Sequence, residues 1–317
     1  INLLILNMEQ EENPKNTGKR ILSILIGLFL VSLIVLYWLF PINSIDFSFN
    51  SNSNFSIESE GEMQFYPNMR FPSKSITYEV DETCSLQKKQ DMNRAFEIIQ
   101  ELTILDFKIS ENGLIHVYCE KKSDKGTDKG FFIAGEGGPT NVTMGKYFNV
   151  IQGGEIILIK NSDCERPNVA IHELLHVLGF NHSDNSNNIM YPVSKCKQTI
   201  GQDNLDKINE LYAYPSLPDL EFEQASAKMK GRVLDLNVTI KNEGLADAGY
   251  FEIVVYGDGK EIKRIESEGI QIGYSQKITM VNNLISKLKI DAMEFSIEAN
   301  FEEINKDNNK IILDMIN

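Results

Sequence analysis

Residues 172–182 read HELLHVLGFNH, and the rest of the sequence is best understood by working outward from this stretch. His172 and His176 are four positions apart, so on a helix both imidazoles project from one face and can bind the same metal ion. Glu173 lies beside them, where its carboxylate can take a proton from a water next to that ion. The stretch therefore predicts a helix that carries two metal ligands and a general base.

A reversal of the chain after this helix supplies a third ligand. Gly179 can adopt the left-handed backbone conformation that ends a helix, and the reversal would bring His182 to the same ion. Three neutral imidazoles leave a fourth coordination position open, as catalytic zinc requires, so we expect one Zn²⁺. The fourth histidine of the chain, His116, lies on an alternating strand pattern, where we expect a core or surface residue and no ligand.

The residues around the motif predict a mixed α+β domain. Apolar residues at helical spacing predict a helix at 86–103. Short apolar or alternating runs predict five strands, at 75–80, 105–110, 114–119, 146–151 and 154–160, the last two joined by a turn at Gln152-Gly153. This order is typical of an open, mixed five-stranded sheet with helices packed on it.

At this point the sequence resembles a known family. HExxHxxGxxH is the signature of the metzincin zinc peptidases, and NNIMYP (187–192) is similar to their Met-containing turn, with Met190 beneath the metal. Ser183 after the third histidine, and Tyr191-Pro192 after the methionine, make the segment more similar to the matrixins than to the other metzincins. The resemblance implies a zinc endopeptidase that acts on a protein or peptide substrate, with Glu173 as general base.

The resemblance also implies how the substrate is held. By the family topology, an edge strand within 141–151 would pair with an extended peptide, and Tyr191 and Pro192 would lie beside the cleft. One alternative is a non-catalytic surface adhesion or scaffold protein that only binds zinc, although degenerate metalloproteases commonly lose the glutamate or a ligand, and both are intact here. Another is an enzyme that acts on non-peptide amides of the cell envelope, because the motif defines the metal chemistry more closely than the substrate.

After AYPSLPD (213–219) the pattern changes to strands alone. Several alternating runs, two of them joined by an Asp258-Gly259 hairpin signal, predict an all-β, immunoglobulin-like sandwich. Residues 218–317 resemble the CARDB module of prokaryotic surface proteins, on LPDLEFE at the start, IKNEG at 240–244 and the run from Glu303 to Asn309. The resemblance implies a module that binds a surface ligand or serves as a spacer.

The start of the chain predicts a membrane anchor. Residues 21–40 contain no charge and, at 1.5 Å per residue, span ~30 Å, the thickness of one hydrocarbon core. Lys15, Lys19 and Arg20 precede this segment, so the positive-inside rule places the N-terminus in the cytoplasm and the later domains outside the cell membrane. A cleaved signal peptide is the alternative, but the apolar region is long for one and no small-x-small cleavage pattern follows it. The expected division is a tail at 1–20, a transmembrane helix at 21–40, a Ser/Asn-rich linker at 41–70, a protease domain at 71–214 and a sandwich at 218–317.

Charge and cysteine content indicate which binding partners and which cellular compartment to expect. The net charge is -14, from 45 acidic and 31 basic side chains, which argues against a nucleic-acid partner. Thiols outside the membrane tend to be oxidised, and the four cysteines allow three pairings, of which chain order favours Cys84–Cys119 and Cys164–Cys196. The loop 184–188 is rich in Asp and Asn, as Ca²⁺ sites are. Polar loops usually face water, however, so the sequence does not support a calcium site here.

Overall fold

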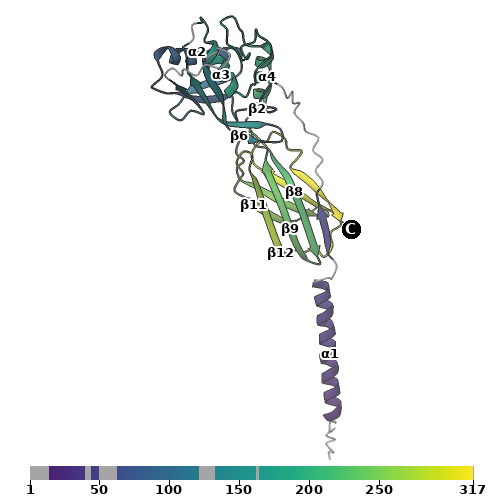
Figure 1. Cartoon of the computed structure of the whole chain (residues 1–317). Coiled ribbons are helices and arrows are strands. Elements are labelled where there is room, and N and C mark those ends of the chain that lie inside the picture. The colour runs from purple at the N-terminus through teal and green to yellow at the C-terminus, as the bar shows by residue number, and fades with distance from the viewer. Residues whose placement is uncertain (1–13, 40–43, 50–62, 121–132, 162–163, 317) are drawn as a thin grey trace, which may run out of the picture.

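The computed structural model describes residues 14–39, 44–49, 63–120, 133–161 and 164–316. These residues form an isolated apolar helix and two β-rich units, which we call the mixed-sheet unit and the sandwich (Figure 1). Each unit has an apolar core of its own, and a smaller apolar cluster lies where the two meet. The observed α+β unit followed by an all-antiparallel unit is the fold class that the sequence predicts.

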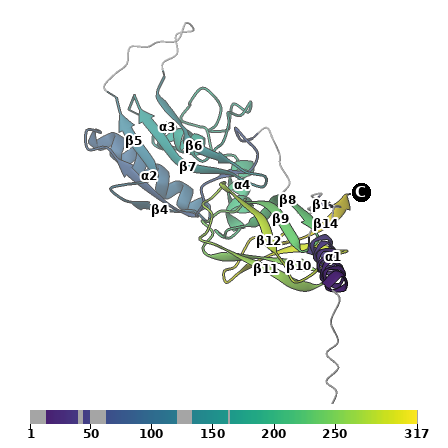
Figure 2. The same ribbon diagram turned by 90° about the horizontal axis from the view of Figure 1, so that it is seen from below.

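The described residues of the mixed-sheet unit form six strands. Five of them follow the order β2-β7-β5-β3-β4, and the sixth, β6, also pairs with β7. The strands are β2 (Met69–Arg70), β3 (Ser75–Val80), β4 (Asp106–Ile109), β5 (Ile115–Cys119), β6 (Gly135–Met144) and β7 (Asn149–Leu158). All pairings are parallel except that of β6. Three expected strands are confirmed as β3, β4 and β5, whereas the expected strands 146–151 and 154–160 fall largely on the single strand β7, and β2 and β6 were not expected. The helices are α2 (Leu86–Leu102), α3 (Asn168–Val177) and α4 (Gln202–Ala213). Figure 2 shows α2 lying along the sheet.

The hairpin of this sheet differs from the one that the sequence predicts. Strands β6 and β7 are joined by residues 145–148, whereas Gln152-Gly153, the expected turn, lies inside β7. The glycines here serve close packing: a Cβ on Gly154 would overlap the side chain of Val177 in α3. The edge strand is therefore β6, and residues 149–151, expected at the edge, belong to the interior strand β7.

The sandwich is an eight-stranded antiparallel sheet in the order β11-β10-β13-β14-β1-β8-β9-β12. Seven of its strands follow the mixed-sheet unit: β8 (Leu220–Lys230), β9 (Val233–Asn242), β10 (Phe251–Gly257), β11 (Lys260–Ser267), β12 (Ser275–Leu284), β13 (Met293–Ala299) and β14 (Lys310–Ile316). The predicted hairpin turn is confirmed, because Asp258 and Gly259 both have positive φ (48° and 72°) and connect β10 to β11. Alternating apolar residues of both halves of the sheet meet in one core.

The eighth strand of the sandwich comes from the segment expected to be a linker. Residues Ile45–Ser48 form β1, which pairs antiparallel with β8 on one side and β14 on the other. Phe47 is 1% exposed and lies in the sandwich core. Farther along the same segment, Gln64 forms a β-bridge with Phe180 of the mixed-sheet unit. Within the expected linker, residues 45–48 and the residues from Gln64 onward are thus part of the folded units, while 41–43 and 50–62 lie outside the described part of the chain.

The passage from the mixed-sheet unit to the sandwich is also ordered. The guanidinium of Arg70, which is fully buried, donates to the carbonyl oxygens of Leu211 and Tyr214. Ser216 donates through its hydroxyl to the carbonyl of Pro72 (2.6 Å), and the carbonyl of Pro218 accepts from the Ile304 amide (3.0 Å). These hydrogen bonds hold the backbone on both sides of the connection, so the two units meet at an ordered joint.

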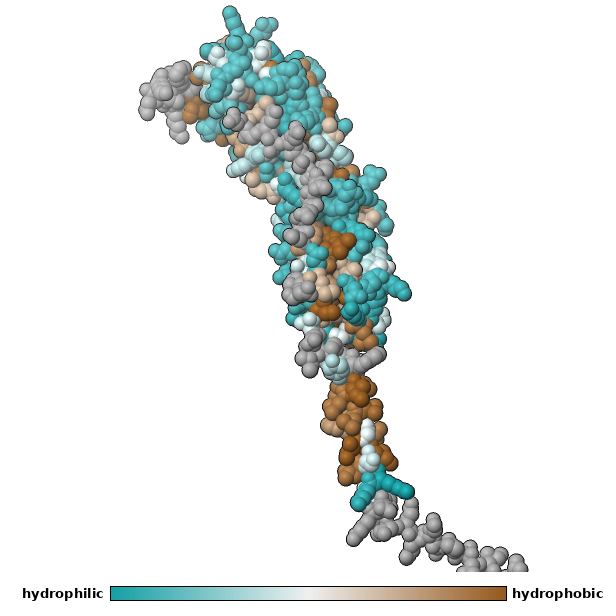
Figure 3. Space-filling view, turned by 90° about the vertical axis from the view of Figure 1, so that its right-hand side faces the viewer, coloured by the Kyte–Doolittle hydropathy of each residue, from teal (hydrophilic) through white to brown (hydrophobic). Residues whose placement is uncertain are grey.

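Helix α1 (Pro14–Leu39) has the length and composition of a membrane-spanning helix. Its apolar window, Gly18–Tyr37, has 20 residues and a mean hydropathy of 2.5, and none of it is buried. In Figure 3 the helix is a continuous brown column below the largely teal body of the molecule. The helix begins at Pro14, before the predicted position 21, and so includes the polar residues that precede the apolar segment.

Both disulfides that chain order favours are present. Cys84, just before α2, is bonded to Cys119 at the end of β5, and Cys164, before α3, is bonded to Cys196. The second bond ties the segment that leads into the histidine helix to the loop that follows Met190. The predicted pairing is therefore confirmed.

Candidate metal centre

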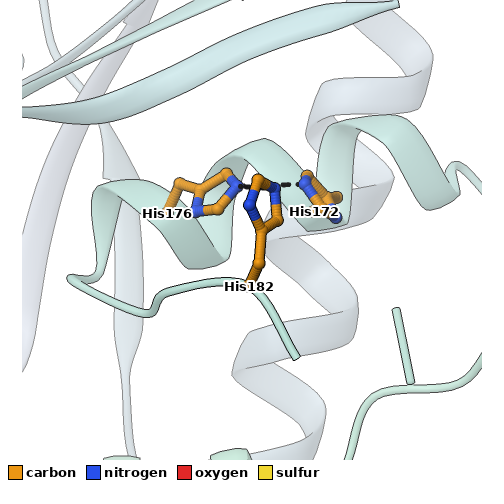
Figure 4. A group of neighbouring side chains, drawn as sticks. All are labelled: His172, His176 and His182. Carbon is orange, nitrogen blue, oxygen red and sulfur yellow. Dashed lines mark hydrogen bonds between the residues drawn. The ribbon is translucent and has the colours of Figure 1, made fainter. Parts of the chain in front are cut away.

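Three imidazoles converge at the C-terminal part of α3. The Nε2 atom of His176 lies 3.0 Å from Nε2 of His172 and 3.2 Å from Nε2 of His182 (Figure 4). His172 and His176 project from one face of α3, as the four-residue spacing predicts, and His182 approaches from the loop beyond the helix. They are the one group of three or more candidate ligands that the described residues bring together.

Backbone carbonyls orient two of these rings. Nδ1 of His172 lies 2.6 Å from the carbonyl oxygen of Ile189, and Nδ1 of His176 lies 2.8 Å from that of Phe180. A carbonyl oxygen only accepts, so each Nδ1 carries the proton and each Nε2 directs its lone pair at the common centre. The rings are thus held in the tautomer that binds a metal.

The chain reversal after α3 occurs at the predicted glycine. Gly179 has φ +94°, and the amide of Phe180 donates to the carbonyl of Leu175 (3.0 Å), a hydrogen bond that closes a helix with a left-handed residue at its end. The returning segment is held by residues 63 and 64: the amide of Asn181 donates to the carbonyl of Met63 (2.9 Å), and Phe180 forms the β-bridge with Gln64. This return places His182 beneath α3.

Burial keeps the three imidazoles neutral. Burial lowers the pKa of His176 to about 4, with a further contribution from the neighbouring His172. The pKa of His172 is lowered by burial and that of His182 likewise. Neutral imidazole is the form that binds a metal, because the proton of an imidazolium occupies the ligand lone pair.

The edge strand packs directly over Glu173. A Cβ on Gly135 would lie 2.9 Å from the Glu173 carboxylate oxygen Oε1, and one on Gly137 would lie 2.5 Å from its carbonyl oxygen. These two glycines of β6 therefore allow an approach that no other residue type permits. Glu173 is 6% exposed, and burial, assisted by the charge of Glu136, raises its pKa to about 8.

The turn that contains Met190 lies beside the site, since the carbonyl of the adjacent Ile189 contacts His172. Met190 is fully buried, its carbonyl accepts from the amide of Ser183 (2.9 Å), and its amide donates to Oδ1 of Asn188 (2.9 Å). Asn188 also donates to Asn204 of α4, so this amide side chain shapes the turn. Within 184–188 the side chains of Asn185 and Asn188 bond to nearby groups of the protein and so add no support for calcium.

The structure places the remaining predicted residues as follows. Tyr191 is half-buried and Pro192 exposed, directly after the turn. His116 lies on β5, half-exposed, 3.6 Å from the carboxylate of Glu79 and apart from the three imidazoles. Sequence reasoning thus separates the fourth histidine from the other three.

Two features of the site were not predicted. The Gly135–Gly137 approach to Glu173 is one, and the pattern GEGG was the available signal. The other is Phe65, whose ring stacks on His176 with centroids 5.7 Å apart. Beyond Phe65 lies a cavity of about 650 Å³, lined by Phe65, Tyr66, Met69, Pro139, Thr140, Val142 and Met144. Phe65 carries no sequence signal, because its approach depends on the distant Gln64–Phe180 bridge.

Each of the two units matches the model of a known protein family. Residues 70–213 match the family model for matrixin, and residues 217–312 match that for CARDB. The chain therefore carries a matrixin-type domain, which suggests a metallopeptidase, followed by a CARDB domain.

The chain was also compared with solved structures and with curated proteins. Among solved structures, the chain is similar to the CARDB domain of the PF1109 protein from Pyrococcus furiosus, which was determined in complex with di-metal ions. The identity is 18%, the match covers 30% of this chain and 89% of that one, and the TM-score is 0.24. No curated protein matches the chain.

Proposed function

We propose that this protein is a zinc-dependent endopeptidase, held at a membrane by α1, with its matrixin-type and CARDB domains on the extracytoplasmic side. The convergence of the three Nε2 atoms next to a buried glutamate is the observation that supports the enzymatic part of the proposal. The matrixin match supports the same reaction class.

The donor set fits zinc. Two nitrogen ligands at 2.0–2.1 Å from a tetrahedral zinc lie about 3.3 Å apart, close to the 3.0 and 3.2 Å between the Nε2 atoms here. His172, His176 and His182 would hold the ion and leave one position open. Bound there, zinc supplies a Lewis acid for the scissile carbonyl and lowers the pKa of an adjacent water.

Glu173 has the position and environment of a general base. It follows the first ligand on α3 and lies under β6, where water has little access. Its carboxylate would take the proton from the attacking water and deliver it to the nitrogen of the leaving amine. Burial alone favours the protonated carboxyl, but a divalent cation at the three imidazoles would favour the ionised form that this role needs.

The edge of the sheet offers a place for the substrate. Among the described strands, β6 pairs only with β7, so its other edge has backbone groups that can pair with an extended peptide. Because β6 crosses Glu173 at Gly135 and Gly137, a peptide paired along this edge would pass the three imidazoles. We therefore place the substrate along 135–144.

The location outside the cytoplasm is supported by two observations. The apolar window of α1 suits a bilayer, and Lys15, Lys19 and Arg20 precede its core, as in helices with a cytoplasmic N-terminus. The two disulfides suit an oxidising compartment.

The proposal is tested with the full chain in detergent micelles. Bound zinc is measured by elemental analysis, and cleavage is assayed on denatured casein, for the wild type and three variants: Glu173→Gln, His182→Ala and His116→Ala. We expect one zinc per chain in the wild type, Glu173→Gln and His116→Ala, and cleavage by the wild type and His116→Ala alone. His116→Ala is the matched control, since it removes the one imidazole that lies outside the site.

Each result has a distinct meaning. Stoichiometric zinc without cleavage by the wild type would favour the non-catalytic adhesion or scaffold protein. Equal cleavage by the wild type and Glu173→Gln would exclude Glu173 as the base. Zinc lost equally from His116→Ala and His182→Ala would show that the ion lies elsewhere.

A further inference from the structure

The turn between β6 and β7, residues 145–148, packs against the sandwich. Its residues Tyr147 and Phe148 are almost fully buried, although the tip of a hairpin normally faces water. They pack in the small apolar cluster with Leu245 of the sandwich, and Ile272 and Ile304 pack against the same cluster. Figure 1 shows β6 at this junction. The sandwich therefore covers the turn of the hairpin to which the edge strand belongs.

Two glutamates of the sandwich hold the backbone and side chains of the same turn. Glu243, 6% exposed, accepts the amide hydrogen of Lys146 through Oε2 (2.7 Å) and forms an ion pair with Lys241 through Oε1 (2.5 Å). Glu221 accepts from the Tyr147 hydroxyl (3.2 Å) and from Nζ of Lys146 (3.0 Å). A buried carboxylate that accepts a backbone N–H forms one of the stronger hydrogen bonds in proteins.

The approach is too close for ordinary side chains. A Cβ on Gly145 would lie 3.0 Å from Oε2 of Glu243, and a Cβ on Gly273 of the sandwich would overlap the side chain of Thr143. Thr143 is on β6 itself, so the sandwich touches the edge strand as well as the turn. A pocket of about 490 Å³ at this contact is lined from both units, by β6 and β7 residues and by residues 245–247, 271, 272 and 274.

One strand thus connects the sandwich to the candidate metal centre. The β6 residues Gly135 and Gly137 lie against Glu173, and about 20 Å farther along the strand Thr143 lies against the sandwich. We propose that the sandwich takes part in substrate binding, with Glu243 as a positioning residue that fixes the 145–148 turn and thereby the free edge of β6. The inference rests on the proposed function, because it assigns that edge to an extended peptide substrate.

The test compares Glu243→Ala with Glu243→Gln in the full chain in detergent micelles. Glutamine keeps an oxygen that can accept the Lys146 amide, so it should partly rescue the alanine defect. Glu261→Ala, an exposed glutamate on β11, is the matched control. Two peptides are taken from one casein cleavage site: a peptide of about 12 residues that can pair along all of β6, and one of about six residues that reaches only the segment next to Glu173.

For Glu243→Ala we expect KM for the longer peptide to rise about tenfold, the factor that corresponds to one charge-assisted hydrogen bond. Its kcat, its zinc content and its KM for the shorter peptide should stay as in the wild type, and amide hydrogen exchange should accelerate at 142–148. Glu261→Ala should resemble the wild type. Glu243→Gln should have a KM between those of the wild type and Glu243→Ala, because the amide keeps the hydrogen bond without its charge. Unchanged KM for the longer peptide, or an equal change for both peptides, would overturn the proposal.

Failure of the proposed function is recognised separately. Binding of the longer peptide is measured by fluorescence anisotropy in the Glu173→Gln background, with and without Glu243→Ala, so no cleavage is needed. If binding weakens with Glu243→Ala while the wild type cleaves none of the substrates, the result would support the positioning role and refute the peptidase. Cleavage by the wild type that Glu243→Ala leaves unchanged would support the peptidase and refute the positioning role. If the wild type neither cleaves nor binds the longer peptide, both proposals are refuted.

Discussion

Replacing Phe47 by alanine should destabilise the sandwich, although this residue precedes the whole mixed-sheet unit. Phe47 lies on β1, between Met315 of β14 and Ala227 of β8, and its ring is in the sandwich core. The substitution leaves the backbone pairing of β1 possible and removes only the buried ring. Its effect therefore measures how far this early segment belongs to the later unit.

The magnitude follows from complete burial. Truncating a fully buried phenylalanine to alanine costs about 3–5 kcal/mol of unfolding free energy, which combines lost transfer free energy with the cavity that remains. A domain of this size has a total stability of roughly 5–15 kcal/mol, so a large part of it would be lost. The neighbouring Asp46 faces solvent and pairs with exposed Lys228, so Asp46→Ala should cost less than about 1 kcal/mol.

The assay is urea unfolding of residues 41–317, followed by far-UV circular dichroism. The helix α1 can be omitted, since its apolar window makes no buried contact. Hydrogen exchange of β8 and β14, read by mass spectrometry, localises the loss to the sandwich. If Phe47→Ala unfolded at the same urea concentration as Asp46→Ala, with exchange in β8 and β14 unchanged, β1 would have no place in the sheet.

Three further outcomes are expected. Burial, together with nearby carboxylates, raises the pKa of Asp219 from 3.8 to about 7, so the folded state keeps a proton that the unfolded state releases. Stability should therefore fall as pH rises from about 4 to 7, and thermal unfolding of Asp219→Asn across this range should show a flatter dependence. Replacing Cys84 and Cys119 by serine opens a loop of 35 residues and should cost up to about 4 kcal/mol in urea unfolding, whereas a cost near zero would show that the bond does not form in solution. Finally, the full chain should resist alkaline carbonate extraction from membranes and the chain without residues 1–40 should not; equal extraction would contradict an anchoring role for α1.

Sequence reasoning succeeded where the determining contacts are local. The convergence of His172 and His176 follows from helix periodicity, and the return of His182 follows from one left-handed glycine. The Asp258-Gly259 turn follows from backbone preferences of two adjacent residues. In each case the physical cause lies within a few residues of the feature.

It failed where the partner is distant in the chain. The turn expected at Gln152-Gly153 lies inside β7. The neighbouring Gly154 is there because α3 packs closely on this strand, which only the tertiary structure shows. Four residues around Phe47 were too few to indicate a strand, and their partners begin at residue 226. Glu243 belongs to a recognised turn motif, yet its contact with Lys146 is set by the joint between two units.

The pairing of β1 with β14 has a consequence for biosynthesis. By residue 213 the ribosome has made every strand, helix and imidazole ligand of the mixed-sheet unit, so that unit can fold while elongation continues. One edge of β1 has no partner strand until β14 is synthesised, about 100 residues later. At ordinary translation speeds this delay is roughly 5–20 s. The support of the 145–148 turn is then among the last contacts to form. Under the proposed function, a nascent copy would bind its metal before the edge of β6 was fixed for a long peptide.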